Sequence, residues 1–337
     1  MSKKFFCLFL VIVCIVSLGL TGCKSPAKPA DGTSSSVQSD ITESAIQNTT
    51  GSTTGAITES TSGSVTPTQT PSDEIAWDDD DTLKILTIGN SFSVDCMEYV
   101  YQIAKAAGVK KIKLGNLYVS GCSLDKHLSN AKEDSKAYTF YTNESGKWVT
   151  NKSYRMSTAV KSDTWDFISF QQASQNSGKA DTYAALDELL PIVESLCPNK
   201  KVEFMWHMTW AYQADSTHSG FANYDNDQMV MYNAIVDAVK AQIVPNTKIT
   251  RIVPNGTAVQ NARTSYLGDT LTRDGYHMSK DKGRLLTGIT MVATTVGIPW
   301  DTIDLTAVYA DQFFLKAALE SVKNAVATPF AVTPSTV

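Results

Sequence analysis

Apolar runs of two kinds alternate along the chain from about residue 82 onward. Runs rich in β-branched and aliphatic residues predict strands at residues 83–88, 111–119, 167–170, 201–208 and 248–253. Stretches with apolar positions every three to four residues predict helices, at 94–107, 182–196, 227–244, 280–296 and 311–326. Strands that alternate with helices indicate one α/β domain, with a mainly parallel five-stranded sheet between two helical layers.

Residues 137–154 interrupt this alternation. Aromatic side chains lie on both sides of the polar tetrapeptide at 143–146. Two short aromatic runs around such a turn predict a β-hairpin. We interpret it as an insertion into the α/β domain.

The first residues of the chain follow a different pattern. Lys3 and Lys4 precede an apolar run at 5–16 that continues through 17–20, which is typical of a secretory signal and short for a membrane-spanning helix. The segment 20–23 ends in Cys23 and resembles the bacterial lipobox, which implies cleavage before Cys23 and lipidation of that residue. The protein is then expected to be exported and lipid-anchored to the bacterial cell membrane, facing the outside. The alternative is a plain signal peptide followed by a coincidental cysteine.

A polar segment separates this leader from the α/β domain. From residue 24 to residue 73, 22 of 50 residues are Ser or Thr, and none is aromatic. So little apolar surface predicts a flexible tether, with a root-mean-square span of roughly 40 Å. The expected organisation is a signal peptide at 1–22, a tether at 23–77 and a catalytic domain at 78–337.

Composition and charge limit the kinds of binding partner that the protein is expected to have. The chain has 337 residues and a net charge of −5, which becomes more negative once Lys3 and Lys4 leave with the leader. This charge argues against nucleic acid as a partner and favours a small neutral or cationic substrate. The mature domain keeps three cysteines, and of these Cys96 and Cys122 either form one bridge or are buried free thiols.

Two segments next to predicted sheet edges contain candidate catalytic residues. In open parallel sheets, ligands bind beyond the carboxyl ends of the strands. Ser91 follows the first strand, and His277 lies three residues after Asp274 in a polar segment. Such an aspartate can orient the imidazole, which then removes a proton from a serine. The alternative for Ser91 or Ser93 is a helix N-cap, and the sequence lacks the Gly-x-Ser-x-Gly of an α/β-hydrolase.

Four short segments together carry a resemblance to a known family. In chain order they are Gly89-Asn90-Ser91-Phe92-Ser93, Gly121, Gln171-Gln172-Ala173-Ser174 and Asp274-x-x-His277. These segments resemble the ordered blocks of the SGNH (GDSL-type) hydrolases, over about residues 82–325. The most similar subgroup is bacterial and known mainly as an uncharacterised domain.

The resemblance implies a flavodoxin-like three-layer sandwich and a role for each matching residue. Ser91 would be the nucleophile, His277 the general base and Asp274 the residue that orients it. The backbone N–H groups of Ser91 and Gly121 would form the oxyanion hole. The family's third donor is a side-chain amide from a Gly-x-Asn-Asp block, which this chain replaces. The candidates for this third oxyanion donor are therefore Gln172, which we prefer, and Gln171.

The substrate pocket is less well defined by the sequence. Asn90, where the family has Asp, lies beside the nucleophile, and Trp210, Tyr212 and His207 follow the fourth predicted strand. Trp210 and Tyr212 are expected either to form a platform for a sugar ring or acyl chain or to pack under neighbouring helices. His207 is expected either to contact substrate or to be a satisfied buried histidine. The sequence has no metal-ligand spacing, phosphate loop or Cys-x-x-Cys pair, so we predict no cofactor and no metal.

These features predict a surface-anchored serine esterase that cleaves O-acyl groups from a small-molecule or glycan ester through an acyl-enzyme. The favoured substrate is an O-acetylated carbohydrate, an expectation that rests on analogy between folds. Two alternatives stay open. One is a surface glycan-binding protein with weak or no turnover, and the other is an O-acyltransferase that uses the same triad.

Overall fold

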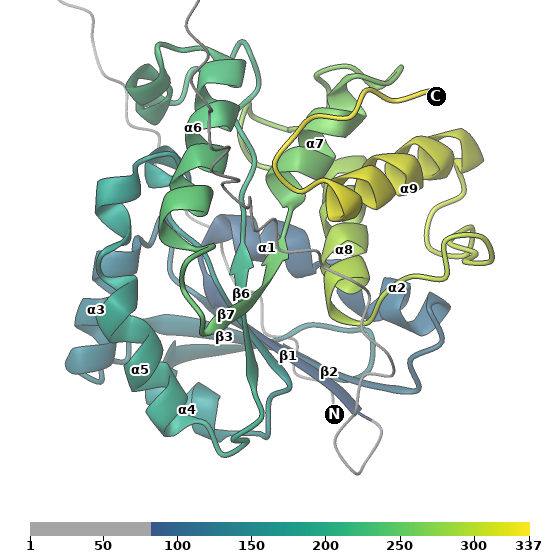
Figure 1. Cartoon of the computed structure of the whole chain (residues 1–337). Helices are drawn as coiled ribbons and strands as arrows, with labels where there is room; N and C mark the ends of the chain where they lie inside the picture. Colours follow the sequence, from purple (N-terminus) through teal and green to yellow (C-terminus); the bar gives the residue numbers. More distant parts are fainter. Residues whose placement is uncertain (1–81) are drawn as a thin grey trace, which may run out of the picture. The chain divides into compact units, whose positions relative to one another are not determined.

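The computed structural model describes residues 82–337, and within them the strands form one sheet in the order β4-β3-β2-β1-β5-β6-β7 (Figure 1). The predicted signal peptide, the tether and Cys23 lie outside the described residues. The strands are β1 (Thr82–Gly89), β2 (Lys111–Tyr118), β3 (Tyr138–Asn143), β4 (Val149–Tyr154), β5 (Phe167–Phe170), β6 (Glu203–His207) and β7 (Ile249–Val253).

Five strands, in the order β2, β1, β5, β6 and β7, are parallel to one another, as predicted. The predicted hairpin is also present, because β3 and β4 pair antiparallel with each other around the polar turn. The hairpin joins the sheet through an antiparallel pairing of β3 with β2, so that the insertion lengthens the sheet by two strands. The α/β fold class and the mainly parallel sheet are therefore confirmed.

Helices cover both faces of this sheet (Figure 1). They are α1 (Ser91–Met97), α2 (Val100–Ala106), α3 (Leu124–Lys132), α4 (Met156–Lys161), α5 (Leu186–Leu196), α6 (Gln228–Gln242), α7 (Asn255–Arg263), α8 (Lys282–Thr295) and α9 (Gln312–Ala327). Helices α1, α2 and α8 pack together on one face, with α9 and α7 against α8, while α3, α4 and α5 pack together on the other. Three 3₁₀ turns, η1 (Ser174–Asn176), η2 (Ala180–Tyr183) and η3 (Ser219–Tyr224), lie in the loops after β5 and β6. None of the described helices is long and apolar enough to cross a membrane.

The helical predictions need correction in two respects, and the short helix α4 was also not predicted. The single helix expected at 94–107 begins at Ser91 and is divided into α1 and α2 at residues 98–99. Helix α7 was not predicted at all. Its polar residues are buried together with its apolar ones, so the segment lacks the one-sided apolar pattern that marks a helix.

The topology places a reversal of winding at β1, the central strand of the parallel part. From β1 the chain first moves outward to β2, and it later returns to β5 on the other side of β1. The carboxyl ends of β1 and β5 therefore flank the point at which open α/β sheets bind ligands. Every residue of β1 after Thr82 is buried, as expected for a strand covered on both faces.

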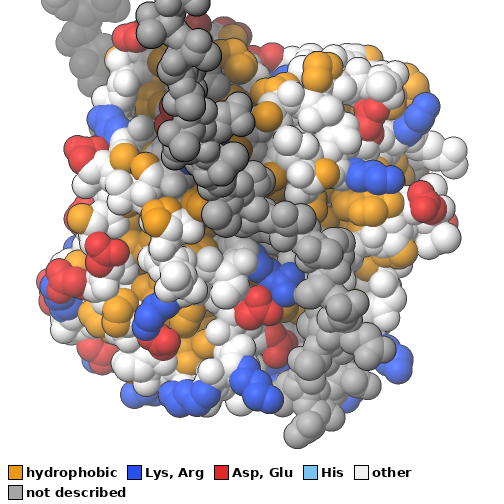
Figure 2. Space-filling view, in the orientation of Figure 1, with side chains coloured by type: hydrophobic (Ala, Val, Ile, Leu, Met, Phe, Trp, Pro, Cys, Tyr) orange, Lys and Arg blue, Asp and Glu red, His pale blue; other side chains and the backbone are white. Residues whose placement is uncertain are grey.

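The surface has mixed charge. On the face drawn in Figure 2, Lys and Arg side chains are interspersed with Asp and Glu wherever side chains of the described residues are visible.

The close packing of β2 against its neighbours gives a stability prediction. A Cβ atom on Gly115 would lie 2.9 Å from Leu86 Cδ1 and 2.9 Å from Trp165 Cη2, closer than packed carbon atoms approach. We expect Gly115→Val to lower the free energy of unfolding by about 1–3 kcal/mol, measured by chemical denaturation. Thr150, an exposed residue of β4, gives a matched control. We expect Thr150→Val to change the free energy of unfolding by no more than about 0.5 kcal/mol. An unchanged midpoint for Gly115→Val would contradict the packing described.

Candidate active site

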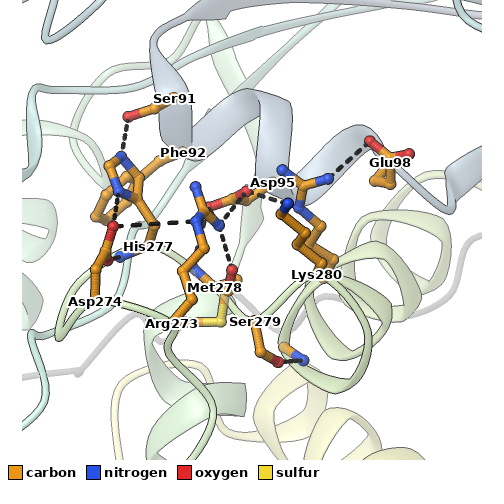
Figure 3. Close-up of polar contacts among 12 residues, drawn as sticks. Ser91, Phe92, Asp95, Glu98, Arg273, Asp274, His277, Met278, Ser279 and Lys280 are labelled. Carbon is orange, nitrogen blue, oxygen red and sulfur yellow. Dashed lines mark hydrogen bonds and ion pairs between the residues drawn. The ribbon is translucent and has the colours of Figure 1, made fainter.

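Ser91, His277 and Asp274 are brought together at the carboxyl edge of the sheet (Figure 3). His277 Nε2 lies 2.8 Å from Ser91 Oγ, and His277 Nδ1 lies 2.8 Å from Asp274 Oδ2. The Asp274 carboxylate accepts from Nδ1–H, which leaves Nε2 as the acceptor for the serine hydroxyl. This is the hydrogen-bonding order that a serine nucleophile, a general base and an orienting carboxylate require.

The local fold explains why Ser91 is available. It is the first residue of α1, and Asn90 is the N-cap whose Oδ1 accepts the Phe92 N–H at 3.0 Å. The N-cap alternative for Ser91 and Ser93 therefore does not hold. Ser93 is buried, and its hydroxyl oxygen lies 2.7 Å from the Asn90 carbonyl oxygen and 2.9 Å from Asn116 Oδ1, so its one O–H is bonded internally. Ser91 is partly exposed, with a hydroxyl in contact with His277.

The predicted oxyanion donors lie at the ends of neighbouring strands. Within residues 82–337, neither the backbone N–H of Ser91 nor that of Gly121 donates a hydrogen bond. Asn90 joins the two loops, because its Nδ2 donates to the carbonyl of Cys122 at 3.2 Å. Gly121 has a φ of +58°, a left-handed conformation that favours glycine, and a Cβ there would meet open space. Glycine is thus needed at this position for the backbone conformation.

The glutamine amides expected to supply a third oxyanion donor are used elsewhere. Gln172 is buried, and its Nε2 donates to the carbonyl and hydroxyl oxygens of Thr182 while its Oε1 accepts the N–H of Leu124. Gln171 is also buried, and its Nε2 donates to Asn90 Oδ1 at 2.9 Å. In this structure the amide nitrogens of Gln172 and Gln171 therefore donate to internal partners.

Trp210 and Tyr212 do not form an exposed platform. Both side chains are fully buried. The Trp210 ring stacks on Phe92, with centroids 4.2 Å apart, and its Nε1 donates to the Tyr276 carbonyl at 2.7 Å. The Tyr212 hydroxyl is 2.8 Å from Ser174 Oγ. The alternative that these aromatic residues pack beneath the surface is the one observed, and Trp210 supports the residues next to both Ser91 and His277.

Asn90 and His207 also lie below the surface, so neither side chain forms part of an exposed binding surface. His207 Nδ1 donates to Gln171 Oε1 at 3.1 Å, and its Nε2 accepts from Asn255 Nδ2 at 2.9 Å. Burial lowers the pKa of His207 to about 3, so this imidazole is neutral. The chain of donors runs from Asn255 through His207 and Gln171 to Asn90, and it fixes the N-cap beside Ser91.

Asp95 was missed in the sequence. Its carboxylate is completely buried and accepts hydrogen bonds from Arg273, from Arg284 and from the backbone N–H of Met278 (Figure 3). It lies four residues after Ser91 in α1, so the same helix carries the nucleophile and the residue that binds the histidine loop. An acidic residue at a helix position next to buried Cys96 and Met97 was the available signal.

A second Asp-x-x-His segment, at Asp215 and His218, does not form the same pair. His218 Nδ1 accepts the N–H of Gly220 at 3.0 Å. Its ring packs against the ring of Tyr276, whose own ring lies next to His277. Burial and the nearby His277 lower the pKa of His218. The spacing alone therefore does not decide which histidine is oriented by a carboxylate.

The electrostatics around Asp274 favour its charged form. Partial burial by itself would raise its pKa, but hydrogen bonds from the His277 side chain and backbone outweigh burial, and the pKa of Asp274 is lowered. The carboxylate is thus available to accept from Nδ1–H over a wide range of pH.

The described cysteines are buried free thiols, Cys96, Cys122 and Cys197, so the alternative of a bridge between Cys96 and Cys122 is not observed. Burial raises the pKa of both Cys96 and Cys122 to about 12, which leaves these thiols protonated. Within residues 82–337, no group of three His, Cys, Asp or Glu side chains is arranged to hold a metal ion.

Comparisons with known proteins agree with the fold. A profile of the family described as "Domain of unknown function (DUF4886)" matches residues 84–302. The crystal structure of a DUF4886 family protein from Bacteroides uniformis ATCC 8492 is 38% identical and superposes with a TM-score of 0.72, covering 76% of this chain and 98% of that chain. No curated protein matches the sequence.

Two more distant structures also align. One is a proposed SGNH hydrolase from Slackia heliotrinireducens, 16% identical over 63% of this chain and 98% of that chain. The other is the lipase Lip_vut3 from a goat rumen metagenome, 11% identical over 64% of this chain and 98% of that chain. Both have a TM-score of 0.40, so neither carries an argument about this site.

The lowered pKa of Asp274 predicts how its contact with His277 contributes to stability. A carboxylate whose pKa is lower in the folded state stabilises that state above its unfolded pKa, near 4, and loses the contribution as pH falls through the folded pKa. We expect Asp274→Asn to cost up to about 1 kcal/mol at pH 7, since the pair is partly exposed. The difference from wild type should shrink below about pH 4, measured by urea denaturation across pH. A difference that does not change with pH would contradict the pairing.

Proposed function

The chain belongs to the DUF4886 family, and we propose that it is a serine ester hydrolase of the SGNH kind that works through an acyl-enzyme on Ser91. The observation that carries the proposal is the continuous hydrogen-bonded order Ser91 Oγ, His277 Nε2, His277 Nδ1 and Asp274 Oδ2, with 2.8 Å at both contacts. The segments that resemble SGNH hydrolases contribute each of these residues.

The proposed reaction follows from this geometry. His277 Nε2 takes the proton as Ser91 Oγ attacks the ester carbonyl, and Asp274 balances the imidazolium that forms. The backbone N–H groups of Ser91 and Gly121 hold the oxyanion. On collapse, the ester C–O bond breaks and the leaving alcohol takes the proton from His277. Water then attacks the acyl-enzyme, with His277 again as base, and releases the carboxylic acid and free Ser91.

We propose an O-acylated carbohydrate, with acetyl as the favoured acyl group, as the substrate class. The buried Trp210 and Tyr212 no longer support this choice. In their place, a hollow of about 250 Å³ borders Asp274 but not Ser91 or His277, and its polar lining suits the hydroxyl groups of a sugar that extends beyond the ester. Its lining includes Gln213, Asp215, Ser216, Thr217 and Thr272. Export and anchoring through Cys23 are part of the same proposal, because they would place the enzyme where surface glycans occur.

A weakly active or inactive glycan-binding protein is the second candidate. The observation in its favour is that the amides of Gln171 and Gln172 are committed to internal hydrogen bonds, which leaves two backbone donors for the oxyanion. Loss of one oxyanion donor lowers turnover by about 10²–10³ in a well-studied protease. The first proposal therefore expects a slow esterase, and the second expects binding without turnover.

The direct test is hydrolysis of p-nitrophenyl acetate and butyrate by the purified protein. We expect Ser91→Ala and His277→Ala to lower kcat by at least about 10³-fold, because each removes a group that handles the transferred proton. Ser93→Ala is the matched control: this serine is two residues away and its hydroxyl is bonded internally, so it should retain turnover within about tenfold.

Wild-type turnover equal to that of Ser91→Ala would contradict the esterase. Acetate release from an acetylated oligosaccharide tests the substrate class, with the butyrate ester as the comparison for acyl length. Equal affinity of wild type and Ser91→Ala for the oligosaccharide, with no acetate released, would support the glycan-binding alternative.

A further inference from the structure

Arg273 lies between two carboxylates, only one of which belongs to the triad. Its Nη1 is 3.0 and 3.2 Å from the two oxygens of Asp95, and its Nε is 4.0 Å from Asp274 Oδ2 (Figure 3). Asp274 Oδ2 is also the oxygen that accepts from His277 Nδ1. The guanidinium and the imidazole therefore compete for the same oxygen atom of Asp274.

The hydrogen bonds on Asp95 decide this competition in the present structure. Asp95 is fully buried, so its charge has to be balanced by cations and N–H donors. In addition to the hydrogen bonds from Arg273, it accepts one from Arg284 Nε at 2.8 Å and one from the Met278 N–H at 3.0 Å. Arg273 Nη1 also donates to the Met278 carbonyl, which ties its side chain to the Asp95 side of the loop.

The consequence for the triad follows from charge. An arginine that moved onto Asp274 would take the acceptor of His277 Nδ1–H. It would also place a second cation beside the imidazolium that forms during the reaction, and that cation would oppose its formation. Holding Arg273 on Asp95 keeps Asp274 free for His277.

We propose that Asp95 is a positioning residue, which holds Arg273 away from Asp274 so that Asp274 can orient His277. It acts through Arg273 and touches no reacting atom. The catalytic consequence rests on the proposed esterase function, whereas the effect on the Asp274–His277 hydrogen bond does not.

The first test is a double-mutant cycle in the full-length chain with p-nitrophenyl acetate. We expect Asp95→Asn to lower kcat by about 10- to 100-fold with KM within about threefold, because binding of the ester is not involved. Arg273→Met alone should keep kcat within about threefold of wild type, because it removes the competitor. The double variant Asp95→Asn/Arg273→Met should recover at least about tenfold in kcat over Asp95→Asn.

Glu98→Gln is the matched control. Glu98 is the C-cap of α1 and accepts from Arg284 Nη1 at 3.1 Å, but it does not contact Arg273. It should keep kcat within about threefold of wild type. A double variant no faster than Asp95→Asn would overturn the proposal, since Asp95 would then act only through Arg284 and the Met278 N–H. A tenfold loss in Arg273→Met alone would also overturn it.

The second test does not depend on turnover. The proton between His277 Nδ1 and Asp274 gives a downfield ¹H NMR resonance, which should be present in wild type, lost or weakened in Asp95→Asn and restored in the double variant. A resonance that is unchanged in Asp95→Asn would overturn the proposal. If Asp95→Asn does not unfold cooperatively and is therefore not folded, the Arg273→Met variant provides the test. Retention of the resonance in Arg273→Met supports the proposal, and its loss overturns the proposal. Wild-type protein that shows the resonance but no ester hydrolysis would contradict the esterase alone.

Discussion

The site depends on holding the loop at residues 272–279 against the first turn of α1. Ser91 and His277 are 186 positions apart in the chain, and their side chains meet only if these two segments keep one relative position. Asp95 bonds to the loop from α1 by accepting the Met278 N–H at 3.0 Å. Trp210 contributes a second, apolar connection, because its ring stacks on Phe92 and its N–H donates to the Tyr276 carbonyl. Both connections are buried or partly buried, where water weakens hydrogen bonds less than it does at the open surface.

A second buried system fixes the other half of the site. The donor chain from Asn255 through His207 and Gln171 ends at Asn90, and it crosses the carboxyl ends of β7, β6, β5 and β1 in turn. Asn90 then donates to the Cys122 carbonyl, next to Gly121. The nucleophile and both proposed oxyanion donors are thereby linked to the strands of the sheet. A Cβ on Gly89 would lie 2.7 Å from Gln171 Oε1, so the glycine before Asn90 makes room for this chain.

The sequence predicted the parts of the molecule that are governed by local pattern. Apolar runs identified the parallel strands and the hairpin, and the resemblance to SGNH hydrolases placed Ser91 with His277. The pattern failed where polar groups are buried, as in α7, because a helix with polar residues on its inner side has no amphipathic signal.

The sequence pattern also could not predict which contacts individual side chains make. Gln171, Gln172 and Trp210 all follow strands, where ligand-binding residues are expected, yet each is committed to an internal contact. Their partners come from other loops, and spacing along one chain does not report such long-range contacts. The two Asp-x-x-His segments show the same limit, since only Asp274 with His277 forms the pair.

The central claim is that Ser91 is a nucleophile activated by His277. Its most direct measurement is covalent labelling with diethyl p-nitrophenyl phosphate, followed by intact mass and peptide mapping. The account predicts one diethylphosphoryl group per chain, on Ser91, with p-nitrophenolate released in equal amount. Labelling should be absent in Ser91→Ala and at least about 10²-fold slower in His277→Ala. Labelling of another residue, or equal rates in wild type and His277→Ala, would contradict it.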